Sequence, residues 1–414
     1  MPQGAQRGSM DDEQKNVAEE QESSEQNIDT SVESDSARAN SDPANLADTY
    51  FEDRPVDEPS RKSGWISNLF FVAVIVLSLV LMYQLSLNAA NGSEKTLKQI
   101  FANLNVEYFC VAVATVIVMI FVDSMKYFLI MRATVGRQKY VTALKVGILG
   151  KYYDNITPFS SGGQPFQIYY LHKKGLSGGQ STAVIFIKFC FNMLMWLAIC
   201  FCLMLFNRSA LTTYVTDTTQ RRLFGVLGWI GFSFNLLIPL TIIAFVIFPK
   251  VMETVTRWVL TLAHKMKIIK SEDALVLRAR RVSKDFRNAF VVMWKKPFHA
   301  ILLMLCCFVE PLLSMMLPYF VVVAFVGNAV VPSWELMFAI MTLHVYVSMS
   351  VAVVPTPGNS GAMENAFLLV LTSVAEGVLF WTVFTWRFFS YYTYVIIGLI
   401  IVIADFVRRN RAKN

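Results

Sequence analysis

The chain has 414 residues, of which 55% are hydrophobic and only 16% are charged. Soluble domains carry about 25% charged residues, so this composition excludes an ordinary soluble protein and indicates an integral membrane protein. The formal net charge of +7 hides two opposite regions, because residues 1–60 hold 4 Lys/Arg and 16 Asp/Glu while the rest of the chain holds 33 Lys/Arg and 14 Asp/Glu.

Residues 1–60 form an acidic tail that is poor in apolar residues. Such a segment cannot bury enough surface to offset its chain entropy, so we expect it to be disordered. It lacks the basic start and the apolar run of a signal peptide. A solvated tail without a specific role is the favoured interpretation, and a regulatory or partner-binding tail is the alternative.

Apolar runs of about 20 residues are needed to cross a bilayer, and the rest of the chain supplies them. Two further apolar segments, 140–170 and 334–373, are interrupted by Asn, Pro and Gly around 155–165 and 355–361. We expect each of these to be a re-entrant hairpin of two half-helices. Six full spans are expected at 65–87, 106–131, 182–206, 224–248, 298–325 and 378–406.

The positions of Lys and Arg set the orientation, because basic loops stay on the cytoplasmic side. Twelve Lys/Arg lie between Lys250 and Lys296, and others precede the first span, flank 140–170 and follow the last span. This pattern puts both termini in the cytoplasm. Hairpin 140–170 then enters from the cytoplasm and returns there, whereas hairpin 334–373 enters from outside and returns outside.

The predicted fold is therefore an all-α polytopic membrane protein with an inverted-topology repeat, as in many secondary transporters. The first half, 61–211, and the second half, 212–407, share the order span, span, hairpin, span, and a short basic cytoplasmic tail, 408–414, follows. No residue-level repeat stands out in support. The alternative is that one broken segment is a full span with a kink, which Pro permits in membrane helices.

The linker 250–297 interrupts the second half. Its apolar residues recur at helical spacing beside basic residues. This pattern is typical of amphipathic helices that lie on an anionic, here cytoplasmic, leaflet.

The first break places small and polar residues at membrane depth, in the run N-I-T-P-F-S-S-G-G-Q-P. Irregular backbone is tolerated there only where protein or water satisfies its polar groups, and the N-terminus of a half-helix attracts anions. The break is thus either a phosphate cradle or a tight turn that needs small residues. The candidate contacts are Asn155, Ser160, Ser161, Gly162, Gly163 and Gln164.

The second break, V-P-T-P-G-N-S-G-A-M-E-N, ends one half-helix at its prolines and begins the next near Glu364. Glu364 fits a helix cap, but an ionisable group in the membrane is by default a functional candidate. Arg387, inside the last span, needs a partner, for which Glu364 and Glu310 are the candidates. The candidate contacts at this break are Pro357, Gly358, Asn359, Gly361, Glu364 and Arg387.

Other polar residues also lie in the apolar runs. Asp123 and Lys126 stand at i, i+3 and can pair with each other, Lys188 lies inside a full span, and His344 is expected to be buried with its hydrogen bonds satisfied. The six cysteines lie in apolar runs without metal-ligand spacing, so we expect buried apolar side chains and neither a metal nor a cofactor.

Two motifs together carry a resemblance to a known family. They are N-x-x-P-x-x-x-G-G-Q-P-F-Q-I-Y-Y-L from Asn155 and P-T-P-G-x-x-G-x-x-E from Pro355. The chain resembles the lysylphosphatidylglycerol synthase transmembrane family, the flippase-like membrane domain of bacterial multiple-peptide-resistance factors, over about residues 65–407. The resemblance implies a polytopic protein of the bacterial cytoplasmic membrane that moves or handles phospholipids. In that family lysylphosphatidylglycerol is made from lysyl-tRNA by a soluble transferase domain, which the few residues after the last span do not provide, so synthase activity is not expected.

The expected function is translocation of a phospholipid with an anionic or aminoacylated headgroup, or of a lipid-linked carrier, with the headgroup between the two hairpins. The alternative is phosphatidylglycerol lysyltransferase or its membrane partner, and a membrane scaffold that uses the acidic tail is a third. The expected partner is a membrane phospholipid. Nucleic acid enters only on the lysyltransferase alternative, and a second copy of the chain and a partner synthase are left open.

Overall fold

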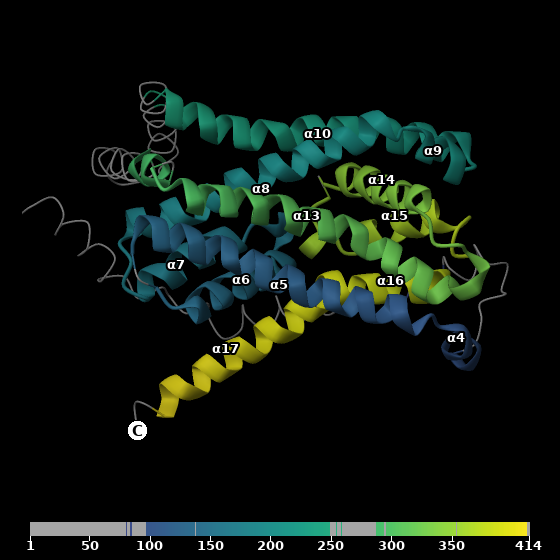
Figure 1. Ribbon diagram of the computed structural model, residues 1–414, viewed down its shortest axis with the longest axis horizontal. Coiled ribbons are helices and arrows are strands. Elements are labelled where there is room, and N and C mark those ends of the chain that lie inside the picture. The colour runs from purple at the N-terminus through teal and green to yellow at the C-terminus, as the bar shows by residue number, and fades with distance from the viewer. Residues whose placement is uncertain are drawn as a thin grey trace, which may run out of the picture. The chain divides into compact units, whose positions relative to one another are not determined.

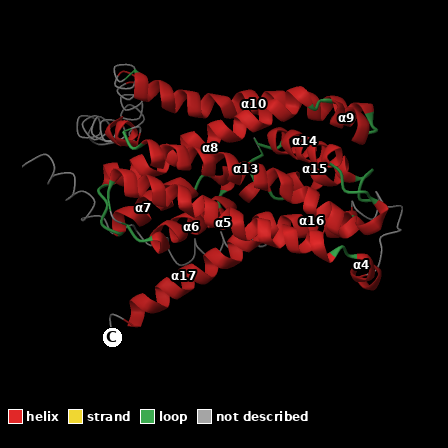
Figure 2. Cartoon of the chain, in the orientation of Figure 1, coloured by secondary structure: helices red, strands yellow, loops and turns green. Residues whose placement is uncertain are grey.

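A computed structural model describes residues 97–248 and 287–411, apart from 137, 294 and 353, together with residues 80, 83, 84, 254 and 258. Within these residues the regular secondary structure is helical, and they contain no strand (Figure 2). The acidic tail, all but three residues of the first predicted span and most of the linker 250–297 lie outside the described residues.

Five stretches of helix are long and apolar enough to cross a membrane (Figure 1). Each coincides with one of the predicted full spans, and the sixth, 65–87, is the one that the structure does not describe. The chain is therefore a multi-pass membrane protein. The five stretches are α5 (Val106–Thr134), α8 (Gly178–Phe206), α10 (Thr218–Ile247), α13 (Pro297–Val326), and the run of α16 (Leu379–Arg387), a π-helical turn (Phe388–Tyr392) and α17 (Thr393–Arg411).

Local signals in the sequence fix where these helices begin. The Asn105 side chain accepts from the N–H of Tyr108 at the start of α5, and the Asp217 side chain caps α10 in the same way. Ser177 and Gln180 form a capping box at the start of α8, while Pro297 stands in the first turn of α13. These residues satisfy or remove N–H groups that a helix start leaves without partners.

Long rows of large apolar side chains remain exposed on α5, α10 and α17. Ile117 is 62% exposed, Leu237 61% and Ile400 59%. An apolar surface of this extent is expected to face lipid. Cys110 and Cys202 are also exposed, so the prediction that all six cysteines are buried is wrong for these two, because a small, weakly polar thiol is equally at home against acyl chains.

Both broken segments are interrupted where the sequence predicts. The first consists of α6 (Tyr140–Ile156), a 3-10 turn at Pro158–Ser160 and α7 (Gly163–Lys173). The second consists of α14 (Trp334–Ser350), a 3-10 turn at Pro357–Asn359 and α15 (Ala362–Leu371). Helices α7 and α15 have 11 and 10 residues, so at about 1.5 Å per residue each reaches only about half of a roughly 30 Å hydrocarbon core.

The helices pack into two apolar clusters, one around each broken segment. One cluster joins α6 and α7 to neighbouring parts of α5, α8 and α13, and the other joins α14 and α15 to α13, α16 and the remaining part of α8. Helix α13 packs along α5 more extensively than any other described pair of helices, and α10 covers α14. Helix α17 packs on α6 through Gly398, where a Cβ would overlap Tyr152. Short helices also lie at Leu97–Asn103 (α4), Ser209–Tyr214 (α9) and Gly327–Ala329.

Candidate functional site

Glu364 and Arg387 form a buried ion pair at the second break. Arg387 Nε lies 2.6 Å from Glu364 Oε1, and Arg387 Nη2 donates to the Gly358 carbonyl oxygen at 3.1 Å. The second carboxylate oxygen, Oε2, accepts from the Gly361 N–H at 2.7 Å. Glu364 is therefore both the cap of α15 and the partner of Arg387. Glu310, the other candidate partner, pairs elsewhere.

The amides of the first break are already occupied by side chains of the same hairpin. The Gly162 N–H donates to Thr157 Oγ1 at 2.9 Å, and the Gly163 N–H donates to Asp154 Oδ1 at 2.8 Å. A Cβ on Gly163 would overlap the Asp154 carboxylate. An anion reaches these two amides only after Thr157 and Asp154 release them.

The two breaks lie against each other. The Tyr391 hydroxyl donates to the Asn155 carbonyl oxygen at 2.9 Å, and Asn155 Nδ2 donates to the Tyr391 carbonyl oxygen at 3.3 Å. The two 3-10 turns are also in contact. These bonds satisfy a carbonyl at the end of α6 that has no partner within its own helix. Residues 236 positions apart in the sequence thus meet at one junction.

The two breaks share a sequence and a backbone conformation. Thr157-Pro158-x-x-Ser161-Gly162 is matched 199 residues later by Thr356-Pro357-x-x-Ser360-Gly361. After each proline come two left-handed residues, with φ of 56° and 50° in the first break and 56° and 55° in the second. Left-handed backbone costs about 1–2 kcal/mol per non-glycine residue, so its occurrence at matched positions is informative. This match is the residue-level repeat that inspection of the sequence alone missed.

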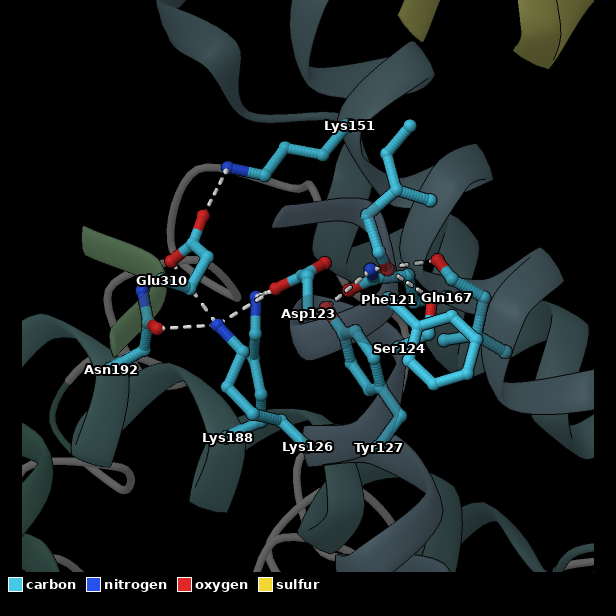
Figure 3. A network of polar contacts seen from close by, with 12 residues as sticks. Phe121, Asp123, Ser124, Lys126, Tyr127, Lys151, Gln167, Lys188, Asn192 and Glu310 are labelled. Atoms are coloured by element: carbon cyan, nitrogen blue, oxygen red, sulfur yellow. Dashed lines mark hydrogen bonds and ion pairs between the residues drawn. The ribbon is translucent and has the colours of Figure 1, made fainter. Parts of the chain in front are cut away.

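Beside the first break lies a cluster of charges, most of them buried, that bridges four helices (Figure 3). Lys126 Nζ lies 2.9 Å from Asp123 Oδ1 and 3.2 Å from Glu310 Oε2. Lys188 Nζ lies 3.1 Å from Asp123 Oδ1, and Lys151 Nζ lies 3.9 Å from Glu310 Oε1. The charges therefore alternate from Lys188 through Asp123, Lys126 and Glu310 to Lys151.

Burial makes this cluster energetically important. The side chains of Lys126, Asp123 and Glu310 are 0%, 4% and 6% exposed, and removing one partner of a buried pair typically costs about 3–5 kcal/mol. The predicted Asp123–Lys126 pair is confirmed. The larger cluster was missed because Glu310 lies 184 residues from Lys126.

A small cavity adjoins the cluster. Its volume is about 30 Å³, which is room for one or two water molecules. Gln167 borders it and donates to the Tyr127 hydroxyl at 2.8 Å. The lining residues are Tyr127, Lys151, Asp154, Gln164, Gln167, Ile185, Lys188 and Phe189.

A family model described as the lysylphosphatidylglycerol synthase TM region matches residues 69–398. The chain belongs to this family. The match covers both breaks, the charged cluster and the Glu364–Arg387 pair, so the resemblance carried by the two motifs is confirmed. Searches of curated proteins and of solved structures each gave no match.

One buried polar residue of this lysylphosphatidylglycerol synthase TM region departs from the prediction. His344 is buried, with its ring in T-shaped contact with the Phe367 and Trp386 rings, but Nδ1 has no hydrogen-bond partner within the described residues. The expectation of a fully satisfied histidine is wrong at this atom, because the imidazole packs against two aromatic rings. In the described part of the chain, no three His, Cys, Asp or Glu side chains gather as metal ligands would.

A larger cavity lies away from both breaks. It has a volume of about 610 Å³ and is lined mainly by α8, α9 and α14, including Phe206, Asn207 and Glu335. None of the twelve predicted contact residues lines it.

Proposed function

We propose that this protein translocates a phospholipid with an anionic or aminoacylated headgroup, or a lipid-linked carrier, across the bacterial cytoplasmic membrane, without a chemical step. The observation that carries the proposal is the contact between the two breaks, joined by the reciprocal hydrogen bonds of Asn155 and Tyr391. A polar junction of two half-helix pairs at membrane depth is the kind of place where membrane carriers bind their substrates.

In this proposal the headgroup passes along the junction. Arg387 takes the phosphate, because a guanidinium binds phosphate oxygens in a forked geometry. Glu364 receives the ammonium of an aminoacylated headgroup when its pair with Arg387 opens. Ser160, Ser161 and Gln164, together with the amides of Gly162 and Gly163, complete the polar surface on the other side, and Asn359 completes it at the second break.

The proposal includes a topology. Six full spans and two re-entrant hairpins follow from the apolar runs and their interruptions. Cytoplasmic placement of both termini and of the linker 250–297 follows from the distribution of Lys and Arg. The matched Thr-Pro-x-x-Ser-Gly motifs, with their matched left-handed residues, support the inverted repeat. The short half-helices α7 and α15 support re-entry, since neither is long enough to cross the bilayer.

The alternative is phosphatidylglycerol lysyltransferase, or a membrane partner of that enzyme, and the family description supports it. Lipid extraction separates the two. A lysyltransferase creates a lysylated lipid in cells that lack it, whereas a translocase changes only the leaflet that a lipid occupies.

Leaflet accessibility in proteoliposomes tests the proposal. Vesicles of phosphatidylcholine carry phosphatidylglycerol with a fluorescent acyl chain in both leaflets, and a membrane-impermeant reductant bleaches the outer leaflet. We expect the protected inner-leaflet fluorescence to disappear with the wild-type protein and to persist with Arg387→Gln. Lys145→Gln is the control, because Lys145 forms a partly exposed pair with Asp405 and contributes to neither break. Protected fluorescence that persists with wild-type protein, for both phosphatidylglycerol and its lysylated form, overturns the proposal.

A further inference from the structure

The charged cluster begins and ends with a lysine, and both lysines line one cavity. Lys188 and Lys151 stand at the two ends of the alternating series and both border the cavity of about 30 Å³. Neither Asp123 nor Glu310, the two carboxylates of the series, lines it. Lys188 and Lys151 therefore line the cavity, whereas the carboxylates that pair with them, Asp123 and Glu310, do not.

The internal repeat relates one of these lysines to Arg387. Lys188 comes 30 residues after Pro158, and Arg387 comes 30 residues after Pro357, each followed by phenylalanine. Each cation also has the same two kinds of neighbour. Lys188 has the Asp123 carboxylate at 3.1 Å and the Tyr127 ring at 4.9 Å, and Arg387 has a carboxylate at 2.6 Å and a tyrosine ring at 4.7 Å.

We propose that Lys188 and Lys151 form a second anion site, which receives the phosphate group of the headgroup at the first break as Arg387 does at the second. The proposal rests on the translocation function and deepens it: a headgroup in transit has one phosphate site in each half of the repeat. The shared chemistry is a phosphate monoanion or dianion recognised by two ammonium groups.

Asp154 occupies this site in the described conformation. Its carboxylate lines the cavity and accepts the Gly163 N–H at the start of α7, which is the position that an anion prefers at a helix N-terminus. The three lysines are balanced formally by Asp123, Glu310 and Asp154. When the Asp154 side chain leaves the site, an entering phosphate restores the balance of negative and positive charge. Asp154 therefore takes the place of the ligand in the described conformation.

A substitution of Lys151 tests a binding role without a large effect on stability. Its side chain is 39% exposed and its distance to Glu310 is 3.9 Å, so it adds little to the stability of the fold. A lysine at the mouth of a water-sized cavity is free to follow a ligand, whereas Lys126, which is fully buried, is held.

Lipid binding to the purified full-length protein in detergent tests this site, with phosphatidylglycerol and diacylglycerol as probes and native mass spectrometry as the readout. We expect wild-type protein to hold phosphatidylglycerol in preference to diacylglycerol. Lys151→Gln and Lys188→Gln are expected to weaken phosphatidylglycerol binding by about tenfold or more, since each removes a charge-assisted contact. Lys188→Arg and the control Lys145→Gln are expected to bind as wild type, and Asp154→Asn is expected to bind more tightly because the stand-in anion is gone.

Inorganic phosphate distinguishes the two sources of the anion. If millimolar phosphate displaces phosphatidylglycerol from wild-type protein, and does so less in Lys188→Gln, the site takes phosphate from either source. If only the lipid shows the loss, the site takes the phosphate from a membrane headgroup. Both results support the site.

Unchanged phosphatidylglycerol binding in folded Lys151→Gln and Lys188→Gln overturns the proposal, and so does weaker binding in Asp154→Asn. If Lys188→Gln does not fold, Lys151→Gln and Asp154→Asn decide alone. The two proposals fail in different assays. If only the translocation function is wrong, wild-type protein still binds phosphatidylglycerol through these lysines, but fluorescent lipid stays in its original leaflet in the vesicle assay.

Discussion

The Glu364 carboxylate divides its two oxygens between two tasks. One oxygen accepts from the Gly361 N–H at the start of α15, and the other accepts from Arg387. The side chain is 1% exposed and that of Arg387 is 7% exposed. The cap alone is a modest interaction of about 1 kcal/mol, whereas the loss of one charge from a desolvated pair is far more costly. An isosteric amide tells the two contributions apart.

We expect Glu364→Gln to lower the free energy of unfolding by roughly 3–5 kcal/mol, because Arg387 is left as an uncompensated buried charge while the amide oxygen still caps the helix. Most translocation is expected to be lost. Adding Arg387→Gln is expected to recover stability without recovering translocation. Thermal unfolding in detergent and the fluorescent-lipid assay measure the two effects.

The matched control for this pair is Asp405→Asn. Asp405 pairs with Lys145 at 2.6 Å, but its side chain is 32% exposed, so the expected loss is about 1 kcal/mol or less. Stability losses that simply add in the Glu364→Gln, Arg387→Gln double variant would contradict the coupling. Translocation at the wild-type rate in Glu364→Gln would reduce this residue to a helix cap.

Gly358 is required at the second break for two reasons. Its φ is +56°, and a Cβ would overlap the Tyr391 ring. We expect Gly358→Ala to destabilise the protein by more than the roughly 1–2 kcal/mol of a left-handed alanine, and to disturb the junction through Tyr391. Gly175→Ala is the control, because Gly175 has a φ of +94° but open space around its Cβ position. Equal melting temperatures for the two variants would show that the overlap with Tyr391 has no consequence.

At the scale of helices, Lys126 joins α5 to α13. It contacts Asp123 on its own helix and Glu310 on α13, and it donates to Asn192 Oδ1 on α8 at 2.6 Å. A buried pair of this kind orients its helices as well as holding them, since its charges find compensation in only one arrangement. The polar side chains thus complement the extensive apolar contact between α5 and α13.

We expect Lys126→Met to destabilise the protein by roughly 3–5 kcal/mol. Within the described residues, the change leaves Glu310 with the 3.9 Å contact to Lys151 alone and deprives Asp123 of one of its two lysines. Combining it with Glu310→Gln is expected to give a smaller loss than the sum of the two single losses. A thermodynamic cycle of the four proteins, measured by thermal unfolding, gives the coupling free energy. Lys145→Met, on the partly exposed pair with Asp405, is the control. A coupling below about 0.5 kcal/mol would show that the pair across α5 and α13 is not energetically linked.

The sequence is sufficient to predict the helices and the breaks, because Pro158 with Gly162, and Pro357 with Gly358, combine proline and glycine inside apolar runs. The isolated prolines of α10 and α13 do not break those helices. The sequence also restricts the partner of Arg387 to Glu364 or Glu310, since few carboxylates are available to a cation inside a membrane, and the structure shows Glu364. The charged cluster is different. Asp123 and Lys126 satisfy each other locally, and nothing in their spacing indicates that Glu310 on a distant helix completes the site.

The sequence also could not predict which groups hydrogen-bond to the amides of the first break. The run from Ser160 to Gln164 predicts amides open to an anion, but whether they are open depends on the side chains of Thr157 and Asp154, which the fold brings back onto the turn. A capping side chain and a ligand compete for the same N–H groups. Sequence pattern indicates the binding potential of the amides, and only the structure shows which group uses it.

At the scale of the whole molecule, the two broken segments are related by a shift of 199 residues. The shift superposes Thr157 on Thr356, Gly162 on Gly361 and Lys188 on Arg387. In an inverted repeat, residues related by such a shift lie on opposite sides of the membrane, whereas in a parallel repeat they lie on the same side. The repeat therefore makes a prediction about sidedness that is independent of the lipid that is moved.

Lys174 and Ser373 are the positions that test it, because they are related by the 199-residue shift and both are exposed just after α7 and α15. We expect Ser373→Cys to react with a membrane-impermeant maleimide in intact cells. Lys174→Cys is expected to react only after permeabilisation, because Lys173 and Lys174 belong to the basic flank that the positive-inside rule retains in the cytoplasm. Ser271→Cys, in the basic linker, is expected to behave as Lys174→Cys.

The exposed Cys110 and Cys202 are replaced by alanine in every variant, and labelling in denaturant confirms that each new thiol is present. Reaction of Lys174→Cys and Ser373→Cys from the same side would leave the repeated motif as a local likeness without inversion, and external labelling at Ser271→Cys would refute the orientation itself.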